Sequence, residues 1–236
     1  MILLRSALFN VVFFGMTAIL TLPGLVIRAV APHRVIDLAR LWAACVIGLA
    51  RVICGISLSV TGQENLGQGA VVIASRHQSA FDTLVWLTLV PDCCYVLKQE
   101  LLRIPLFGPL IRSTGMIAID RAGGAATIRQ LMREGERAAQ EGRQIIIFPE
   151  GTRGDAGRML PLQPGVAALA SRTRLRVVPV LTDSGLCWGR RSFQKRPGTI
   201  RIDIRPPLPD GLRREALMDR LTAELQASPS TVKVCG

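Results

Sequence analysis

The sequence predicts an α/β fold, in which a largely parallel sheet is flanked by helices, with a membrane-associated helical hairpin at the N-terminus. Two observations support this prediction. From about residue 61, short β-type runs alternate with helical stretches, which is the pattern of a parallel sheet covered by helices. The first 60 residues contain instead two long apolar stretches. We therefore divide the chain into an anchoring helical pair, residues 1–60, and an α/β domain, residues 61–236.

The first apolar stretch, Ser6 to Ile27, contains 22 residues without a charge and is long enough to cross a hydrocarbon core. It is too long for the apolar part of a signal peptide, and no small-residue cleavage site stands out. We interpret it as an uncleaved anchor. Pro23-Gly24 is expected to kink or end this helix. A basic segment follows between residues 28 and 40.

The second apolar stretch runs from Leu41 to Val60 and is interrupted by Arg51. A charge in that place favours an interfacial or re-entrant helix over a clean span. We expect the two stretches to form a hairpin that dips into one leaflet, although two crossings would also return the chain to its starting side. The alternative is a pair of buried core helices in a soluble protein.

Six strands are expected in the α/β domain, at Ala70–Ser75, Cys94–Leu97, Met116–Ile119, Gln144–Phe148, Arg176–Leu181 and Thr199–Ile204. Four helices are expected between or after them, at Phe81–Val90, Gly124–Glu141, Pro164–Arg172 and Leu212–Ala227. Pro179 stands in the middle of the fifth strand, which indicates an edge strand or a bulge.

The composition narrows the classes of partner. The formal charge is +12, which suits nucleic acid, an anionic membrane face or acidic substrates. The basic residues are dispersed, aromatic residues make up only 5%, and no nucleic-acid-binding motif is present, so we expect a membrane surface and no nucleic acid. The six cysteines lack metal-type spacing and are expected to act as small hydrophobic residues in a reducing compartment.

The segment after the first predicted strand of the α/β domain carries a histidine five residues before a carboxylate, His77 and Asp82. An imidazole that takes a proton from an alcohol needs an acceptor to hold one tautomer and to stabilise the imidazolium. The two side chains can meet if His77 lies in the turn and Asp82 in the first helical turn. The alternative is that Asp82, three residues after Ser79, only caps that helix and that His77 is an ordinary turn histidine.

A second segment, Glu150-Gly151-Thr152-Arg153, follows the strand that Pro149 ends. Ligands of open α/β sheets bind at the carboxyl ends of strands. Gly151 allows close backbone approach, and Thr152 and Arg153 can donate to phosphate oxygens. Arg121 ends another strand and is expected at the same edge. The alternative is a surface turn with a Glu–Arg pair.

Four blocks in this order resemble the glycerolipid acyltransferase family: His77-x4-Asp82, Gly115–Arg121, Phe148–Arg153 and Val178-Pro179-Val180. The closest branch is that of the bacterial 1-acylglycerol-3-phosphate (lysophosphatidic acid) acyltransferases, whose linking segment is similar to Lys98–Leu101 and Ile104–Gly108. The resemblance spans roughly residues 60–205. It departs from the family at Arg76, where asparagine is usual, and at Met116–Ala118, where an aromatic residue is common.

The resemblance implies a glycerol-3-phosphate acyltransferase-like fold and an acyltransferase catalytic domain. His77 would be the general base and Asp82 its partner. The lysophospholipid phosphate site would be shaped by Glu150, Gly151, Thr152, Arg153 and Arg121, with assistance from Lys98. The expected reaction moves a fatty acyl group from acyl-CoA or acyl carrier protein to the sn-2 hydroxyl of lysophosphatidic acid, giving phosphatidic acid, with no metal or other cofactor.

The thioester donors are cytosolic, so we expect the catalytic domain on the cytoplasmic face of the inner membrane, in contact with membrane lipids. Since every candidate reactive residue follows residue 70, the hairpin is expected to set where the reaction happens and not how. Three alternatives remain: another lysolipid acceptor such as lyso-ornithine lipid, a non-catalytic basic membrane-binding scaffold, and a lipid hydrolase. The absence of a G-x-S-x-G motif argues against the hydrolase.

Overall fold

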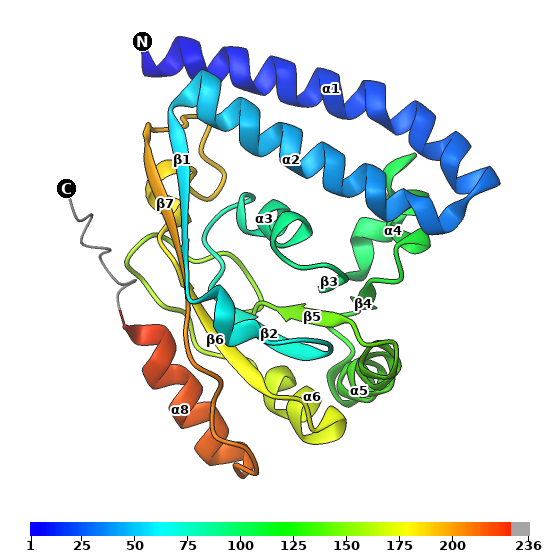
Figure 1. Ribbon diagram of the computed structural model, residues 1–236, viewed down its shortest axis with the longest axis vertical. Coiled ribbons are helices and arrows are strands. Elements are labelled where there is room, and N and C mark those ends of the chain that lie inside the picture. The colour runs from blue at the N-terminus through cyan, green and yellow to red at the C-terminus, as the bar shows by residue number, and fades with distance from the viewer. Residues whose placement is uncertain (228–236) are drawn as a thin grey trace.

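A computed structural model describes residues 1–227 of the chain. A seven-stranded sheet forms the middle layer, in the order β1-β7-β6-β2-β5-β3-β4 (Figure 1). Every neighbouring pair is parallel except β6 and β7. The strands are β1 Ile56–Thr61, β2 Val71–Ser75, β3 Cys93–Lys98, β4 Ile117–Ile119, β5 Gln144–Ile147, β6 Val177–Thr182 and β7 Gly198–Ile204. The predicted largely parallel sheet is confirmed.

Helices cover both faces of the sheet, with α1, α2 and α3 on one side and α5, α6 and α8 on the other (Figure 1). The helices are α1 Ile2–Val30, α2 Val35–Cys54, α3 Asp82–Leu89, α4 Phe107–Ser113, α5 Gly124–Gln140, α6 Gly165–Thr173, α7 Ser184–Cys187 and α8 Arg214–Gln226. Residues 1–227 also form the short 3-10 helices η1 Pro32–Arg34, η2 Gln63–Leu66 and η3 Gln99–Arg103.

The central strands are apolar throughout because both of their faces are buried. Successive residues point to opposite faces: Ile73 of β2 packs in the cluster with Trp86 of α3, whereas Val72 and Ala74 pack with Leu131 of α5. Two apolar cores therefore hold the sheet, and both fix the strand ends at which the candidate residues lie.

The first helix exposes most of its apolar surface. Only Ser6, Phe9 and Gly24 of α1 are buried. Within the described residues, α1 is the single helix long and apolar enough to cross a membrane, with a mean hydropathy of 1.9 over its best window. For α1, the alternative of a buried core helix is therefore wrong, and its surface is compatible with membrane association. The helix continues through Pro23 to Val30, so losing one backbone hydrogen bond does not end it there.

The second helix is shorter than predicted. It ends at Cys54, because Gly55 takes the left-handed conformation (φ 70°) and its N–H bonds the Arg51 carbonyl. The expected helix as far as Val60 is wrong at this end: residues 56–61 form β1, which pairs with β7. The alternation of serine with apolar residues after Gly55 explains the strand. The division of the chain into domains at residue 60 remains a prediction.

The strand with the central proline is not at an edge. β6 lies between β7 and β2, so the edge-strand alternative is wrong. Pro179 pairs with Ala74 of β2, while the pairing with β7 begins one residue later, at Val180 and Ile204. Because successive strand residues bond to alternate neighbours, the N–H that Pro179 lacks would face β7 where that strand has just ended. The Pro179 carbonyl still accepts the Arg205 N–H at 2.9 Å.

Cysteines in the described part of the chain are unpaired, and four of these five are buried; Cys235 lies outside the described residues. Burial raises the pKa of Cys94 to about 11. Across residues 1–227, no group of three or more His, Cys, Asp or Glu side chains is placed to hold a metal ion.

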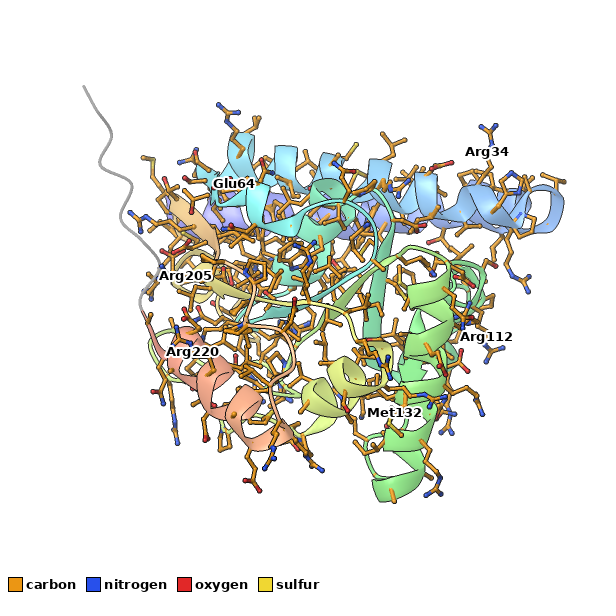
Figure 2. The ribbon with its side chains drawn as sticks, turned by 60° about the horizontal axis from the view of Figure 1, so that its bottom comes forward. Arg34, Glu64, Arg112, Met132, Arg205 and Arg220 are labelled. Carbon is orange, nitrogen blue, oxygen red and sulfur yellow. The ribbon has the colours of Figure 1, made fainter. Side chains whose placement is uncertain are left out.

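The positive charge is spread over several elements. Arg34, Arg112 and Arg220 extend outward from the end of the hairpin, from α4 and from α8 (Figure 2). The positive charge of the described residues is therefore not confined to one surface.

Candidate active site

The carboxyl ends of four parallel strands bring the predicted residues to one edge of the sheet. His77 follows β2, Lys98 ends β3, Arg121 follows β4 and Arg153 follows β5. All four line one cavity of about 540 Å³. Residues that are far apart in the sequence are therefore brought together at one edge of the sheet, as expected for parallel strands.

His77 lies in the turn between β2 and α3, and Asp82 is the first residue of α3. The His77 Nδ1 and Asp82 Oδ2 atoms are 3.2 Å apart. The same Oδ2 accepts the backbone N–H groups of Gln78 at 2.7 Å and Ser79 at 2.8 Å. These two donors fix the carboxylate, which accepts from Nδ1 and leaves Nε2 as the imidazole atom with a free lone pair.

The imidazole is held in place from several sides. It stacks on the Phe148 ring, with centroids 4.0 Å apart and an interplanar angle of 16°, and Tyr95 stacks on that ring in turn. The His77 carbonyl accepts the Gly154 N–H at 2.8 Å. His77 is only 8% exposed, so the surrounding residues restrict the movement of its ring.

Glu150 bonds the backbone of His77 and is not among the residues that line the cavity. Its Oε1 accepts the His77 N–H at 3.1 Å, and its Oε2 accepts the Leu160 N–H at 3.4 Å. Burial raises the pKa of the Glu150 carboxyl, against the opposing effects of the His77 N–H and of Arg76. The buried Arg76 donates to the Arg158 carbonyl at 2.9 Å. Glu150 is therefore placed to orient the histidine turn.

The turn after β5 presents Thr152 and Arg153 to the cavity, while Gly151 turns the chain with a φ of 69°. The Gly151 carbonyl accepts a hydrogen bond from the Arg121 guanidinium, which joins the turns after β4 and β5. Burial lowers the pKa of both Arg121 and Arg153. Lys98 is exposed and lies 2.9 Å from Glu100. The structure thus gathers the predicted basic residues at one end of the cavity.

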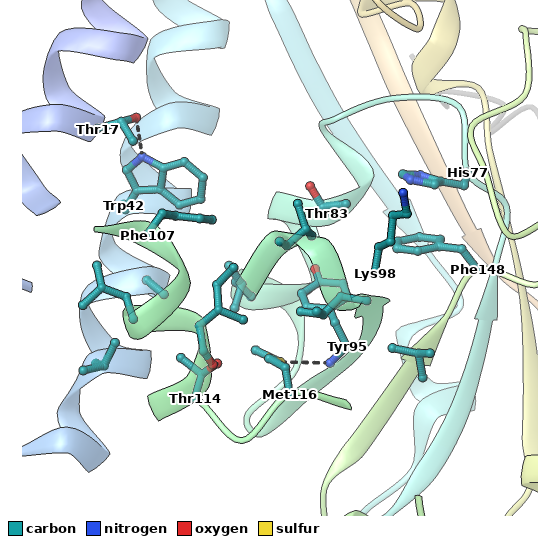
Figure 3. A pocket seen from close by; sticks show the side chains of 18 of the residues that line it. Thr17, Trp42, His77, Thr83, Tyr95, Lys98, Phe107, Thr114, Met116 and Phe148 are labelled. Carbon is teal, nitrogen blue, oxygen red and sulfur yellow. Dashed lines mark hydrogen bonds between the residues drawn. The ribbon is translucent and has the colours of Figure 1, made fainter. Parts of the chain in front are cut away.

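The opposite end of the cavity is apolar, and the N-terminal hairpin supplies much of it (Figure 3). Trp42 of α2 donates from its indole N–H to the Thr17 hydroxyl of α1 at 3.0 Å. The other hairpin and α4 residues that line this end are Leu20, Thr21, Val35, Leu38, Ala39, Phe107, Leu110 and Ile111. The hairpin therefore forms a wall of the cavity in addition to its expected role as an anchor. That it sets where the reaction happens and not how remains a prediction.

Two further lining residues, Arg190 and Arg191, were absent from the sequence-based set. They lie in the segment between α7 and β7. The only feature of the sequence that could have indicated them is that two arginines are adjacent. This feature is not specific, because adjacent arginines also occur at the solvent-exposed start of α8.

These features define a class of protein. A buried histidine–carboxylate pair, a cationic surface on one side and an apolar cavity on the other suit an enzyme that activates a hydroxyl group on an amphipathic substrate.

Comparison with known proteins identifies the family. The family model described as Acyltransferase matches residues 57–183. The 1-acyl-sn-glycerol-3-phosphate acyltransferase of Pseudomonas aeruginosa is 36% identical over 71% of this chain and 65% of its own length. The enzyme of the same name from Limnanthes douglasii is 35% identical over 85% of this chain and 69% of its own length. The chain belongs to the acyltransferase family, and it spans about two thirds of the length of these two relatives.

A solved structure agrees with the fold. The crystal structure of the 1-acyl-sn-glycerophosphate (LPA) acyltransferase from Thermotoga maritima superposes with a TM-score of 0.74, covering 96% of both chains at 20% identity. This coverage includes the N-terminal helices as well as the sheet.

Proposed function

We propose that the protein transfers a fatty acyl group from a thioester donor to the sn-2 hydroxyl of 1-acyl-glycerol-3-phosphate, forming phosphatidic acid. The observation that carries the proposal is the His77–Asp82 pair, whose histidine lines a cavity that has a cationic end and an apolar end. The substrate has matching parts: a phosphate, a hydroxyl and an acyl chain. The names of the two relatives aligned above support this choice of acceptor.

In the proposed reaction, His77 Nε2 takes the proton from the acceptor hydroxyl while the hydroxyl oxygen attacks the thioester carbonyl carbon. The new C–O ester bond forms and the C–S bond breaks. The leaving thiolate then takes the proton from the His77 imidazolium, which restores the neutral imidazole. Asp82 stabilises the imidazolium through Nδ1 during this step.

Direct transfer is favoured over a covalent acyl-enzyme. Ser75 and Ser79, the two serines nearest to His77 in the chain, are both buried. The Ser75 hydroxyl donates to the Arg76 carbonyl at 3.1 Å, and the Ser79 hydroxyl oxygen accepts the Phe81 N–H at 3.0 Å. No cysteine or serine is among the described residues that line the cavity. A thioester is already activated, so we propose that the reaction needs neither a nucleophilic residue nor a metal.

The two ends of the cavity have separate roles in this proposal. Arg153, Thr152 and Arg121 bind the acceptor phosphate, with Lys98 at the rim, because guanidinium groups form charge-assisted hydrogen bonds with phosphate oxygens. Gly151 shapes this turn and Glu150 holds the histidine turn against it. The apolar end, near Trp42, accommodates an acyl chain.

We also propose that the protein works at the inner membrane with its catalytic domain on the cytoplasmic face. The exposed apolar surface of α1 supports membrane attachment. The donors, acyl-CoA or acyl carrier protein, are cytosolic, so the cavity mouth must reach that side. The basic residues between α1 and α2, among them Arg34, would contact anionic lipid there.

An acylation assay with purified full-length protein in lipid nanodiscs tests the proposal. The protein is supplied with lysophosphatidic acid, lysophosphatidylglycerol or lyso-ornithine lipid, and with labelled acyl-CoA or acyl carrier protein. We expect phosphatidic acid as the main product, with the label at the sn-2 position. Faster acylation of either of the other lysolipids, or none with any donor, would overturn the assignment of the acceptor.

A further inference from the structure

The segment between α7 and β7 adds positive charge to the cavity from outside the four motif blocks. Arg190 and Arg191 both line the cavity. Among residues 1–227, neither of them nor Arg153 has a carboxylate within 4.0 Å or a side-chain hydrogen bond. Lys98 and Arg121, by contrast, have protein partners. Three arginines therefore line the cavity with guanidinium N–H groups that can donate to a bound ligand.

Two of these arginines affect each other. The pKa of the Arg153 guanidinium is lowered mainly by burial; Asp82 opposes this effect, and the nearby charge of Arg190 adds to it. Like charges that share a site repel each other, and an anion bound between them removes the repulsion. Arg153 and Arg190 thus line one cavity close enough for their charges to interact, which suits an anion bound there.

The segment is held firmly against the first turns of α1. Lys195 is 3% exposed; its Nζ donates to the Ser192 and Phe193 carbonyls at 3.0 Å and lies 5.1 Å from the centre of the Trp188 ring. The Lys195 N–H donates to the Ser6 hydroxyl of α1 at 2.9 Å. A segment fixed in this way presents its arginines at a low cost in conformational entropy.

Trp188 makes the second attachment to α1. Its ring meets Phe9 edge-to-face, with centroids 5.2 Å apart and an interplanar angle of 87°. The anchoring helix therefore supports the loop that carries Arg190 as well as the apolar wall.

We propose that Arg190 joins Arg153 in binding the phosphomonoester of the acceptor and selects it over phosphodiester headgroups. This inference rests on the proposed function. A phosphomonoester carries a charge of about −1.5 to −2 near pH 7, whereas a phosphodiester carries about −1. A second unpaired guanidinium therefore favours the monoester, which also presents three terminal oxygens to donors from two sides.

The test compares Arg190→Ala with Arg196→Ala, which removes the same charge from the same exposed loop but does not line the cavity. We expect Arg190→Ala to lower kcat/KM for lysophosphatidic acid about tenfold, and for lysophosphatidylglycerol less than threefold. Arg190→Lys should recover part of the loss, and Arg196→Ala should match the wild type. Equal losses for both acceptors, or equal losses in both alanine variants, would overturn the proposal.

Two further readouts identify which phosphate is bound. The KM for acyl-CoA should be unchanged in Arg190→Ala; a raised donor KM with an unchanged acceptor KM would assign Arg190 to the donor instead. The ratio of wild-type to Arg190→Ala activity should also shrink below about pH 6, where the monoester loses its second charge. If the wild type itself fails to acylate lysophosphatidic acid, the proposed function fails before this inference is reached.

Discussion

Replacing Asp82 by asparagine separates the two roles that the structure gives this carboxylate. Oδ2 accepts the Gln78 and Ser79 N–H groups and also lies 3.2 Å from His77 Nδ1. Asparagine retains an oxygen of nearly the same position for the two backbone donors. It loses the negative charge that stabilises the imidazolium. The turn should therefore survive while proton transfer is impaired.

The size of the effect follows from the lost interaction. A hydrogen bond to a charged group contributes about 1.5–3 kcal/mol, and each 1.36 kcal/mol of activation free energy is tenfold in rate. Loss of this one hydrogen bond to the charged imidazolium should lower the kcat of Asp82→Asn about 10- to 150-fold. If the asparagine amide turns toward Nδ1, the histidine tautomer changes and the loss becomes larger, as in other histidine–carboxylate systems.

The assay measures kcat for lysophosphatidic acid acylation together with thermal unfolding. We expect the KM for the acceptor within threefold of the wild type and the melting temperature within a few degrees, since the two backbone hydrogen bonds persist. A kcat within threefold of the wild type in a stable Asp82→Asn protein would refute the reasoning, and would leave Asp82 as a residue that only stabilises the turn.

Three further predictions concern the buried acid, the apolar cavity and the anchor. Burial places the folded-state pKa of Glu150 above its unfolded value, so the Glu150 carboxyl favours folding most at low pH and loses that contribution as pH rises above about 4.5 through the folded pKa. This part of the pH dependence of the unfolding free energy, measured by urea unfolding, should disappear in Glu150→Gln. Ala39→Phe should fill part of the cavity and shift preference toward shorter acyl donors in a competition assay, while Ala44→Phe, on the exposed face of the same helix, should not. Val11→Lys combined with Ile19→Lys, at positions more than two-thirds exposed on α1, should weaken vesicle binding in a flotation assay; unchanged binding would mean that this face does not contact lipid.

The positions of the main site residues could be predicted from the sequence because local signals and parallel pairing determine them. His77, Lys98, Arg121 and Arg153 each end or follow an apolar strand, and parallel strands place those ends at one edge. The contact between His77 and Asp82 also follows from a turn that leads directly into a helix.

Other features depend on contacts between distant segments, which no local pattern reveals. The strand at residues 56–61 continues an apolar run, and only its pairing with β7 and the turn at Gly55 distinguish it from helix. Pro179 is tolerated inside the sheet because a neighbouring strand happens to end beside it. The cavity wall at Trp42 and the arginines at 190 and 191 arise where α1 and α2 meet the catalytic domain.

The measurement that tests the central claim most directly is phosphatidic acid formation by His77→Ala and by the wild type, from lysophosphatidic acid and a labelled acyl donor in nanodiscs. General base catalysis contributes about 10²- to 10⁴-fold, so the variant should lose at least 99% of the wild-type kcat while it still binds the acceptor. A folded His77→Ala protein that retains a tenth or more of the wild-type kcat would contradict the account, because the proton would then have to leave the hydroxyl by another route.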